Sequence, residues 1–291
     1  MRGKGSLQAL RIGARVFSGA GPFLMGVVNV TPDSFSDGGL FLDPAAAVAH
    51  ALRLVSEGAD LLDLGGESTR PGAPEVPAEQ EAARVVPVIE RLRQAGCTTP
   101  ISVDTRKAAV ARAALAAGAD LVNDVSALAD PAMAQLVADQ RVPVVLMHTR
   151  GTPADMARLA VYGDVVGEVE RELALALERA VKAGVREDQV VLDPGIGFAK
   201  QACHSLALLA ALPALRRRLG RPLLVGPSRK SFIGEVTGAA ASERLPGTLA
   251  AVTACVLAGV ELVRVHDVGA ARQAALVAAA IRDASASPGE G

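Results

Sequence analysis

Cysteine is scarce in this sequence, which contains only Cys97, Cys203 and Cys255. Their number is odd and no two of them have the CxxC spacing, so neither a disulfide framework nor a zinc site is indicated. This usage of cysteine is typical of a reducing compartment. We therefore expect a cytoplasmic protein.

Long apolar runs are also missing. The first 20 residues contain no apolar stretch of the kind found in a secretory signal. The alanine-rich segments further along are interrupted by charges before they reach the roughly 20 apolar residues that a membrane span needs. We expect a protein that is neither secreted nor inserted in a membrane.

The chain has almost no net charge, since its formal charge is −1 and its pI is near 6.4. Such a balance gives no general attraction for nucleic acid or for an anionic membrane. An anionic substrate would therefore have to be bound by a few local cations. We expect small-molecule substrates as partners.

Length and composition favour one main domain. The chain has 291 residues, of which 50% are hydrophobic, and an α/β barrel of this size forms a single core. Residues 1–20 are predicted to be an N-terminal extension, in which Leu7 to Ser18 suit a short β-hairpin that plugs one end of the barrel. Residues 21–284 are predicted to be the barrel, and residues 285–291 a disordered tail.

One pattern recurs through residues 21–284, in which an apolar strand ends in polar residues and a helix follows. Leu24 to Val28 is a short unbroken apolar run, typical of a strand that is buried on both faces. Asn29 ends this strand, and a loop rich in glycine and acidic residues follows. Further strands are predicted at 59–64, 101–104, 121–124, 144–148, 190–192, 222–225 and 262–265.

The helices follow from similar signals. Asp43 and Pro44 are a typical helix start, with a helix predicted to run to Glu57. Longer helices are predicted at 161–183 and, as the last element, to about Ala284. Eight strand–helix units predict a closed (β/α)₈ TIM barrel of the α/β class, with a doubly wound parallel sheet as the alternative.

A barrel of this kind brings distant residues together. The loops that follow its strands all lie on one face, so the polar residues at the strand ends are expected to converge there. The loops at the opposite face are mostly short turns of Gly, Ala, Asp or Thr. The converging residues are Asn29, Thr69, Asp104, Asn123, His148, Asp193, Lys230, Arg264 and His266.

The chemistry of these groups suggests a ligand. Asp104, Asn123 and Asp193 could exchange hydrogen bonds with a flat heterocycle that has amidine-like edges, although each alone could equally cap a strand end or form an ion pair. Arg264 and His266 alternate on the last strand, so both face one side and could bind phosphate oxygens. Asn29 offers the kind of neutral oxygen that holds Mg²⁺ alongside phosphate and water.

Eight sequence motifs, spread from about Pro22 to Val268, resemble those of the dihydropteroate synthase family in the same order. Two departures are small, since Thr149 stands where many members have Met, and Pro227 where Val or Thr is commoner. The motifs are LMGVVNVTPDSFSDGG, DLGGESTRPGA, ISVDT, VND, MHTRGTP, DPGIGF, SRKSFIG and RVHDV.

This resemblance implies the joining of 6-hydroxymethyl-7,8-dihydropterin diphosphate to p-aminobenzoate, a step of folate biosynthesis that sulfonamides inhibit. It implies that the pterin is held by Asp104, Asn123, Met147, Asp193 and Lys230. The groups implied for the diphosphate are Asn29 with Mg²⁺ as the cofactor, Thr69, Arg264 and His266.

The same resemblance implies that p-aminobenzoate is bound by Ser231 and Pro71. It further implies that the loop after Asn29 and the loop after the strand at 59–64 close over the site and exclude water during the reaction. The catalytic residues so implied are Asp33, Phe35, Asp37, Arg70 and Lys230. The family also forms homodimers through helices of the barrel, which implies a homodimer here.

Two other functions stay open at this point. A methyltetrahydrofolate-dependent methyltransferase that serves a corrinoid protein would also need Asp and Asn for a pterin, but it would not need Arg264 or His266 for a diphosphate. A non-catalytic pterin-binding relative would keep Asp104 and Asn123 and should have lost loop or metal-binding residues. A turnover assay would distinguish all three.

Overall fold

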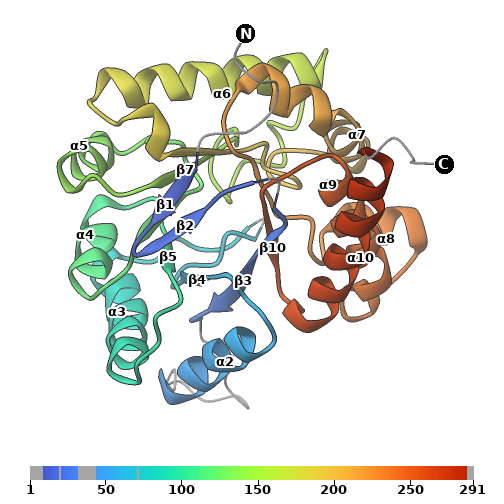
Figure 1. The fold of residues 1–291 in the computed structure, drawn as a ribbon. Coiled ribbons are helices and arrows are strands. Elements are labelled where there is room, and N and C mark those ends of the chain that lie inside the picture. Colours follow the sequence, from blue (N-terminus) through green and yellow to red (C-terminus); the bar gives the residue numbers. More distant parts are fainter. Residues whose placement is uncertain (1–8, 20, 32–43, 71, 287–291) are drawn as a thin grey trace, which may run out of the picture.

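Eight parallel strands form the centre of the fold in the computed structural model of this protein (Figure 1). The structure describes residues 9–19, 21–31, 44–70 and 72–286. The strands are β3 (Phe23–Asn29), β4 (Leu61–Gly65), β5 (Ile101–Asp104), β6 (Leu121–Asp124), β7 (Val144–Met147), β8 (Val190–Asp193), β9 (Leu224–Val225) and β10 (Leu262–Val265).

The order of the strands identifies a barrel. Neighbours run β8-β7-β6-β5-β4-β3-β10-β9, and a parallel bridge between Leu192 and Leu223 joins the two ends of this series. A doubly wound sheet would leave those ends apart. The predicted (β/α)₈ barrel is therefore confirmed for the residues that the structure describes.

Helices form a ring outside the strands (Figure 1). Buried apolar residues on the inner faces of these helices pack against the outward-facing strand residues in one large core. The helices are α2 (Pro44–Ser56), α3 (Ala78–Gln94), α4 (Ala108–Ala116), α5 (Pro131–Gln140), α6 (Val165–Lys182), α7 (Ala202–Leu219), α8 (Ser231–Thr237), α9 (Leu245–Leu257) and α10 (Val268–Ala286).

Two helix boundaries differ from the prediction by more than one residue. Helix α6 begins at Val165 rather than Val161, because the side chain of Asp164 accepts a hydrogen bond from the Gly167 amide and so caps the helix there. Helix α10 continues to Ala286, two residues beyond the predicted end. Residues 287–291 lie outside the described residues.

The predicted N-terminal hairpin is present as β1 (Leu10–Ile12) and β2 (Arg15–Phe17), which pair antiparallel. Leu10, Ile12 and Phe17 are buried in a second apolar cluster with the inward-facing residues near the amino ends of the barrel strands. The hairpin thus closes the amino end of the barrel. A ligand site in the barrel is therefore expected at the carboxyl ends of the strands.

None of the helices in the described residues is long and apolar enough to cross a membrane.

Candidate active site

A network of charged side chains lies inside the barrel, one layer above the apolar cluster that the hairpin covers. Arg264 on β10 donates from Nε to Asp63 Oδ2 at 2.6 Å and from Nη2 to Asp104 Oδ2 at 2.9 Å. Asn123 donates from Nδ2 to the same Asp63 oxygen at 3.1 Å. The network therefore joins four strands that are distant in the sequence.

Burial controls the charge of this network. The Asp104 side chain is only 10% exposed. Burial, followed by the neighbouring charge of Asp63, raises its pKa from 3.8 to about 7, although Arg264 opposes the shift. Asp104 is therefore poised to change its protonation state when a charged ligand arrives.

This shift makes the stability of the protein depend on pH. Because the folded pKa of Asp104 lies above its ordinary value of 3.8, the folded state holds the proton more tightly, and the free energy of unfolding should fall as pH rises from about 4 to about 7. Asp104→Asn should lack this contribution. Urea unfolding across that range should show a flatter profile for the variant than for the wild type.

Asp188→Asn is the matched control, because the ion pair with Arg186 lowers the pKa of Asp188 and its contribution changes only at more acidic pH. Parallel pH profiles for the wild type and Asp104→Asn would contradict the assignment of a raised pKa to Asp104.

The second part of the site is the turn after β8. Asp193 is buried, and its Oδ1 accepts a hydrogen bond from the Gly195 amide at 2.7 Å. Burial raises the pKa of Asp193 to about 6, against the effect of the Gly195 amide and of Lys230. A carboxylate that can accept further hydrogen bonds therefore stands at the end of this strand.

Lys230 lies across this turn. Its Nζ is 4.1 Å from the centroid of the Phe198 ring, a cation–π contact. Gly197 has φ +79°, and a Cβ there would lie only 3.1 Å from Cδ of Lys230, so this glycine makes room for the lysine stem. Burial, followed by repulsion from Arg264, lowers the pKa of Lys230 to about 8.

His266 follows β10 and differs from the sequence-based expectation of a second possible cation. Its Nδ1 lies 2.9 Å from the Ser228 hydroxyl, and its amide donates to the same oxygen at 3.2 Å. Burial and the nearby cations Arg264 and Arg229 lower its pKa to about 3. The imidazole is therefore neutral and can serve in hydrogen bonding, not as a positive charge.

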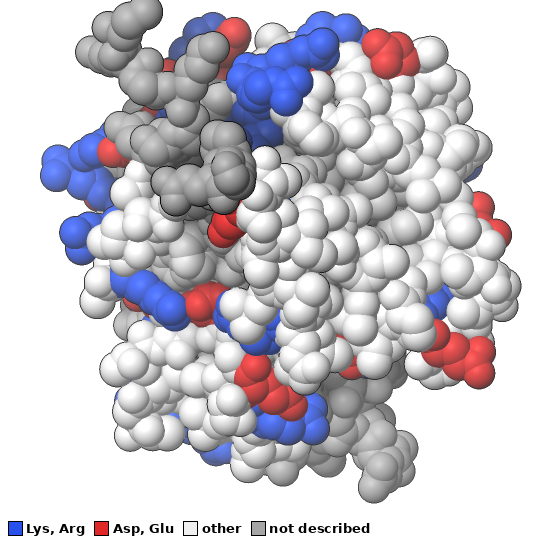
Figure 2. All heavy atoms as spheres, turned by 45° about the vertical axis from the view of Figure 1, so that its right-hand side comes forward, with Lys and Arg blue, Asp and Glu red and all other residues white. Residues whose placement is uncertain are grey.

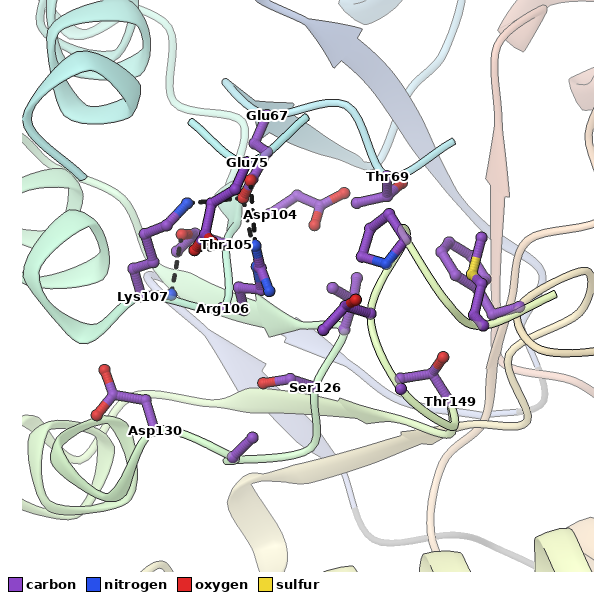
Figure 3. A pocket seen from close by; sticks show the side chains of 17 residues that line it. Glu67, Thr69, Glu75, Asp104, Thr105, Arg106, Lys107, Ser126, Asp130 and Thr149 are labelled. Atoms are coloured by element: carbon purple, nitrogen blue, oxygen red, sulfur yellow. Dashed lines mark hydrogen bonds and ion pairs between the residues drawn. The ribbon is translucent and has the colours of Figure 1, made fainter. Parts of the chain in front are cut away.

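A cavity of about 350 Å³ opens beside Asp104 at the mouth of the barrel (Figure 3). Its size suits a small heterocyclic ligand. Thr69 and Glu67 line it from the loop after β4, and Phe198 from the turn after β8. Lys107 donates to Glu67 at 2.7 Å and to the buried Glu81 at 2.6 Å, so the β4 loop is attached to the barrel wall at this point.

Four other predicted site residues lie within the described residues, namely Asn29, Met147, Arg70 and Ser231. Asn29 is the last residue of β3 and pairs in register with Gly65, while Met147 ends β7 opposite Asp193. Arg70 and Ser231 are exposed, and Ser231 is the first residue of α8. The remaining predicted site residues, Asp33, Phe35, Asp37 and Pro71, lie outside the described residues.

Three residues of the site were not predicted from the sequence, namely Asp63, Phe198 and Ser228. Asp63 is fully buried, and its Oδ1 has no hydrogen-bond partner among the described residues. A single acid within the apolar strand LLDLG was a signal, because a buried carboxylate needs a cation nearby. Phe198 and Ser228 lie within motifs that were recognised, but nothing in their spacing marked them.

Comparison with known proteins agrees with this geometry. The family model described as pterin binding enzyme matches residues 25–266. The dihydropteroate synthase of Synechocystis sp. is 46% identical over 94% of this chain and 94% of its own length, and that of Neisseria meningitidis serogroup B is 49% identical over 87% and 90%.

Solved structures agree as well. The Xanthomonas albilineans dihydropteroate synthase with 4-aminobenzoic acid superimposes with a TM-score of 0.89 at 49% identity, covering 97% of this chain and 100% of that one. The same enzyme in complex with 7,8-dihydropteroate gives a TM-score of 0.85 at 47% identity, with 97% and 100% covered. This chain therefore belongs to the pterin-binding enzymes and, within them, to the dihydropteroate synthases.

Proposed function

We propose that this site joins 6-hydroxymethyl-7,8-dihydropterin diphosphate to p-aminobenzoate, forming 7,8-dihydropteroate and diphosphate. The observation that carries the proposal is the interior network in which Arg264 bridges Asp63 and Asp104 beside Asn123. It combines carboxylates for an NH-rich heterocycle with a cation for the departing diphosphate. The alternative corrinoid methyltransferase has no need of this cation.

The pterin would bind against the strand ends. Asp104 uses Oδ2 for Arg264, and Asp193 uses Oδ1 for the Gly195 amide, which leaves the second oxygen of each carboxyl group for donors of the heterocycle. Asn123 and Lys230 add polar contacts at the same level. Met147, which is buried at the end of β7, would provide an apolar wall for the ring.

The diphosphate would bind around Arg264, Thr69 and His266. The guanidinium has five N–H donors and uses Nε and Nη2 for Asp63 and Asp104, so further donors are available to phosphate oxygens. Neutral His266 would contribute hydrogen bonding only. Stabilising the charge of the leaving diphosphate allows the pterin methylene carbon to become cationic before the aniline nitrogen of p-aminobenzoate attacks it.

Mg²⁺ is proposed as the cofactor, held on the protein side by Asn29. No group of three or more His, Cys, Asp or Glu residues in the described ranges could hold a metal ion. A single amide oxygen at the end of β3, completed by diphosphate oxygens and water, fits the preference of Mg²⁺. When bound there, the ion would offset negative charge on the diphosphate.

For p-aminobenzoate we propose Ser231 and Pro71 as binding residues. Ser231 is exposed at the start of α8, next in sequence to Lys230. Arg70, on the loop after β4, would close over this part of the site together with Asp33, Phe35 and Asp37. This closure would exclude water from the cationic carbon.

We also propose a homodimer and a cytoplasmic location. The face around α9 and α10 carries few charged side chains (Figure 2), and Leu257, Leu276, Val277 and Ile281 are each between 46% and 61% exposed there. An exposed apolar face of this kind suits a second copy of the chain. The three cysteines are free thiols, in keeping with a reducing compartment.

A turnover assay tests the proposed reaction. Purified protein with pterin diphosphate, p-aminobenzoate and Mg²⁺ should form dihydropteroate. Omitting either substrate should give no product, and removing Mg²⁺ should reduce the rate by at least about a hundredfold, since this ion stabilises the leaving diphosphate. Chelation followed by addition of Mg²⁺ should restore activity. Pterin binding without turnover would instead identify a non-catalytic relative, and methyl transfer from methyltetrahydrofolate to a corrinoid would identify the methyltransferase.

A further inference from the structure

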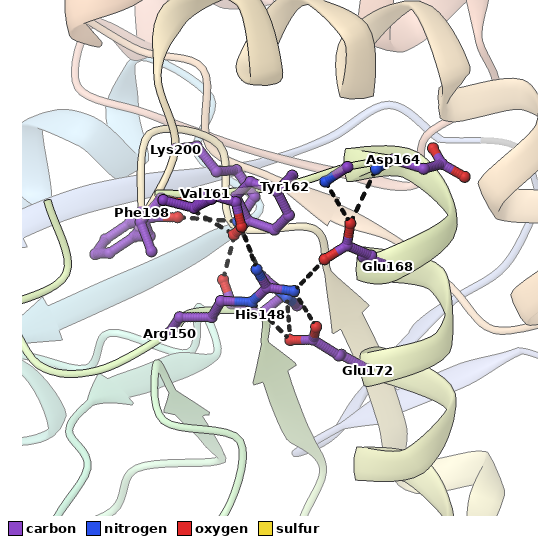
Figure 4. Close-up of polar contacts among 11 residues, drawn as sticks. His148, Arg150, Val161, Tyr162, Asp164, Glu168, Glu172, Phe198 and Lys200 are labelled. Atoms are coloured by element: carbon purple, nitrogen blue, oxygen red, sulfur yellow. Dashed lines mark hydrogen bonds and ion pairs between the residues drawn. The ribbon is translucent and has the colours of Figure 1, made fainter. Parts of the chain in front are cut away.

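A cluster of buried ionisable groups lies behind the substrate site, between β7, α6 and the turn after β8 (Figure 4). His148 directly follows β7, and its Nε2 lies 2.9 Å from Glu172 Oε2 on α6. On its other side, His148 Nδ1 lies 2.9 Å from Lys200 Nζ. Both His148 and Lys200 are less than 10% exposed.

The contacts of Lys200 define the state of His148. An ammonium group has three donors and no acceptor, and Lys200 Nζ also donates to the Phe198 carbonyl at 2.9 Å and to the His148 carbonyl at 3.5 Å. In its ammonium form Lys200 can only donate to His148 Nδ1, which places the imidazole proton on Nε2, where it is donated to Glu172; burial lowers the pKa of Lys200 to about 7. Burial and the Lys200 charge lower the pKa of His148 to about 4, in agreement with a neutral ring.

Glu172 is itself held in place by the loop after β7. Arg150 forms ion pairs with Glu172 and with Glu168, and it donates to the Val161 carbonyl at 2.7 Å. The Arg150 guanidinium also lies 4.1 Å from the centroid of the Tyr162 ring. The acceptor for His148 is thus fixed by several contacts, so His148 is a rigid anchor.

The turn that Lys200 holds carries two parts of the substrate site, Asp193 and Phe198. Its backbone lies directly on β7, because a Cβ at Gly195 would meet the His148 carbonyl oxygen at 1.9 Å, and Gly195 has φ +67°. The His148 amide donates to the Asp193 carbonyl at 2.8 Å. Lys200 then fixes the far end of the turn by its bond to the Phe198 carbonyl.

We propose that Lys200, anchored by neutral His148, is a positioning residue that fixes the Phe198 ring under Lys230 and so aims Lys230 into the substrate site. Lys200 acts through the Phe198 carbonyl, and the Phe198 ring then acts on Lys230 Nζ at 4.1 Å. The effect on catalysis rests on the proposed role of Lys230 in pterin binding. The effect of Lys200 on the turn after β8 does not depend on that proposed role.

Lys200→Met tests the proposal, because it keeps an unbranched side chain that is only one heavy atom shorter and removes all three donors. Hydrogen exchange in the substrate-free protein should show the amides of Gly195 and Phe198 exchanging at least about tenfold faster, because the turn has lost an anchor. Lys182→Met is the matched control, since Lys182 is exposed at the end of α6. It should leave these amides unchanged.

Calorimetry then tests the link to Lys230. Lys200→Met should weaken binding of the pterin diphosphate about tenfold in the wild-type background, but less than about twofold in a Lys230→Met background, because the two residues act through one another. A merely structural role for Lys200 would give the same loss in both backgrounds. That result, or unchanged exchange at Gly195 and Phe198, would overturn the proposal.

Two further points allow a failed variant, a wrong proposed function and a wrong positioning role to be told apart. If Lys200→Met does not fold, Lys200→Gln keeps one donor for the Phe198 carbonyl and gives the same comparison with a smaller effect. If the wild type fails to bind pterin diphosphate, the proposed function of the site is wrong. The exchange experiment needs no substrate and decides the positioning role in that case.

Discussion

Arg264→Met is expected to abolish turnover and to lower the free energy of unfolding by about 3–5 kcal/mol, the usual cost of breaking a buried ion pair by removing one partner. Arg264 contacts two carboxylates, and the Asp63 side chain has no exposed surface. Without the guanidinium, Asp63 and Asp104 would face each other with no cation between them. Turnover falls for a second reason, because the proposed grip on the diphosphate is lost.

Calorimetry and thermal unfolding measure the loss of stability in Arg264→Met. A loss of this size should lower the melting temperature by roughly 10 °C in a chain of this length. Arg264→Lys is the comparison variant, since it keeps a charge but cannot reach Asp63 and Asp104 with two planar donors, and it should lose an intermediate amount. Turnover for Arg264→Met within a few-fold of the wild type would show that the diphosphate is bound elsewhere.

A second substitution tests whether the unpaired Asp63 carboxylate causes the loss of stability in Arg264→Met. Adding Asp63→Asn to Arg264→Met replaces the orphaned carboxylate by a neutral group of the same shape, so it should recover part of the stability but none of the turnover. If the double variant is no more stable than Arg264→Met alone, then the unpaired charge of Asp63 is not the source of the loss.

The barrel could be predicted from the sequence, because each of its strands is a short apolar run that is followed by polar residues. The sequence also predicted that Asp104, Asn123 and Arg264 converge, since the fold alone brings strand ends together. It did not predict that Arg264 would already be paired with two acids. That pairing depends on the reach of a long side chain across the barrel interior, which no local pattern records.

Charge states were harder still to predict. Burial and the nearby cations Arg264, Arg229 and Lys230 lower the pKa of His266 to about 3, and Arg229 and Lys230 belong to the loop after β9, which is distant from His266 in the sequence. Asp63 was missed for a related reason. Asp63 lies in the middle of β4, not at a strand end, and only its partners on β6 and β10 give it a role.

Asp193→Asn is expected to weaken binding of the pterin diphosphate by more than about tenfold while the fold persists. A charged hydrogen bond in a buried site contributes about 1.5–3 kcal/mol, and 1.4 kcal/mol corresponds to a tenfold change in affinity. Asparagine has the same shape and can still accept the bond from the Gly195 amide, now made by Asp193 Oδ1 at 2.7 Å. What it loses is the charge that interacts with Lys230 and that would face the pterin in the proposed complex.

The pH dependence of the wild type adds a second criterion. Since burial raises the pKa of Asp193 from 3.8 to about 6, its ionised form is disfavoured in the folded protein, and the stability cost appears as pH rises from about 4 to about 6. The Asn variant never ionises there, so its melting temperature should lack this fall with pH and should not drop below that of the wild type near neutral pH. Asp188→Asn, in the 3₁₀ turn Glu187–Gln189 before the amino end of β8, is the control and should leave pterin affinity unchanged. Equal affinities of Asp193→Asn and the wild type in calorimetry would mean that the turn after β8 positions Lys230 but does not itself bind the pterin.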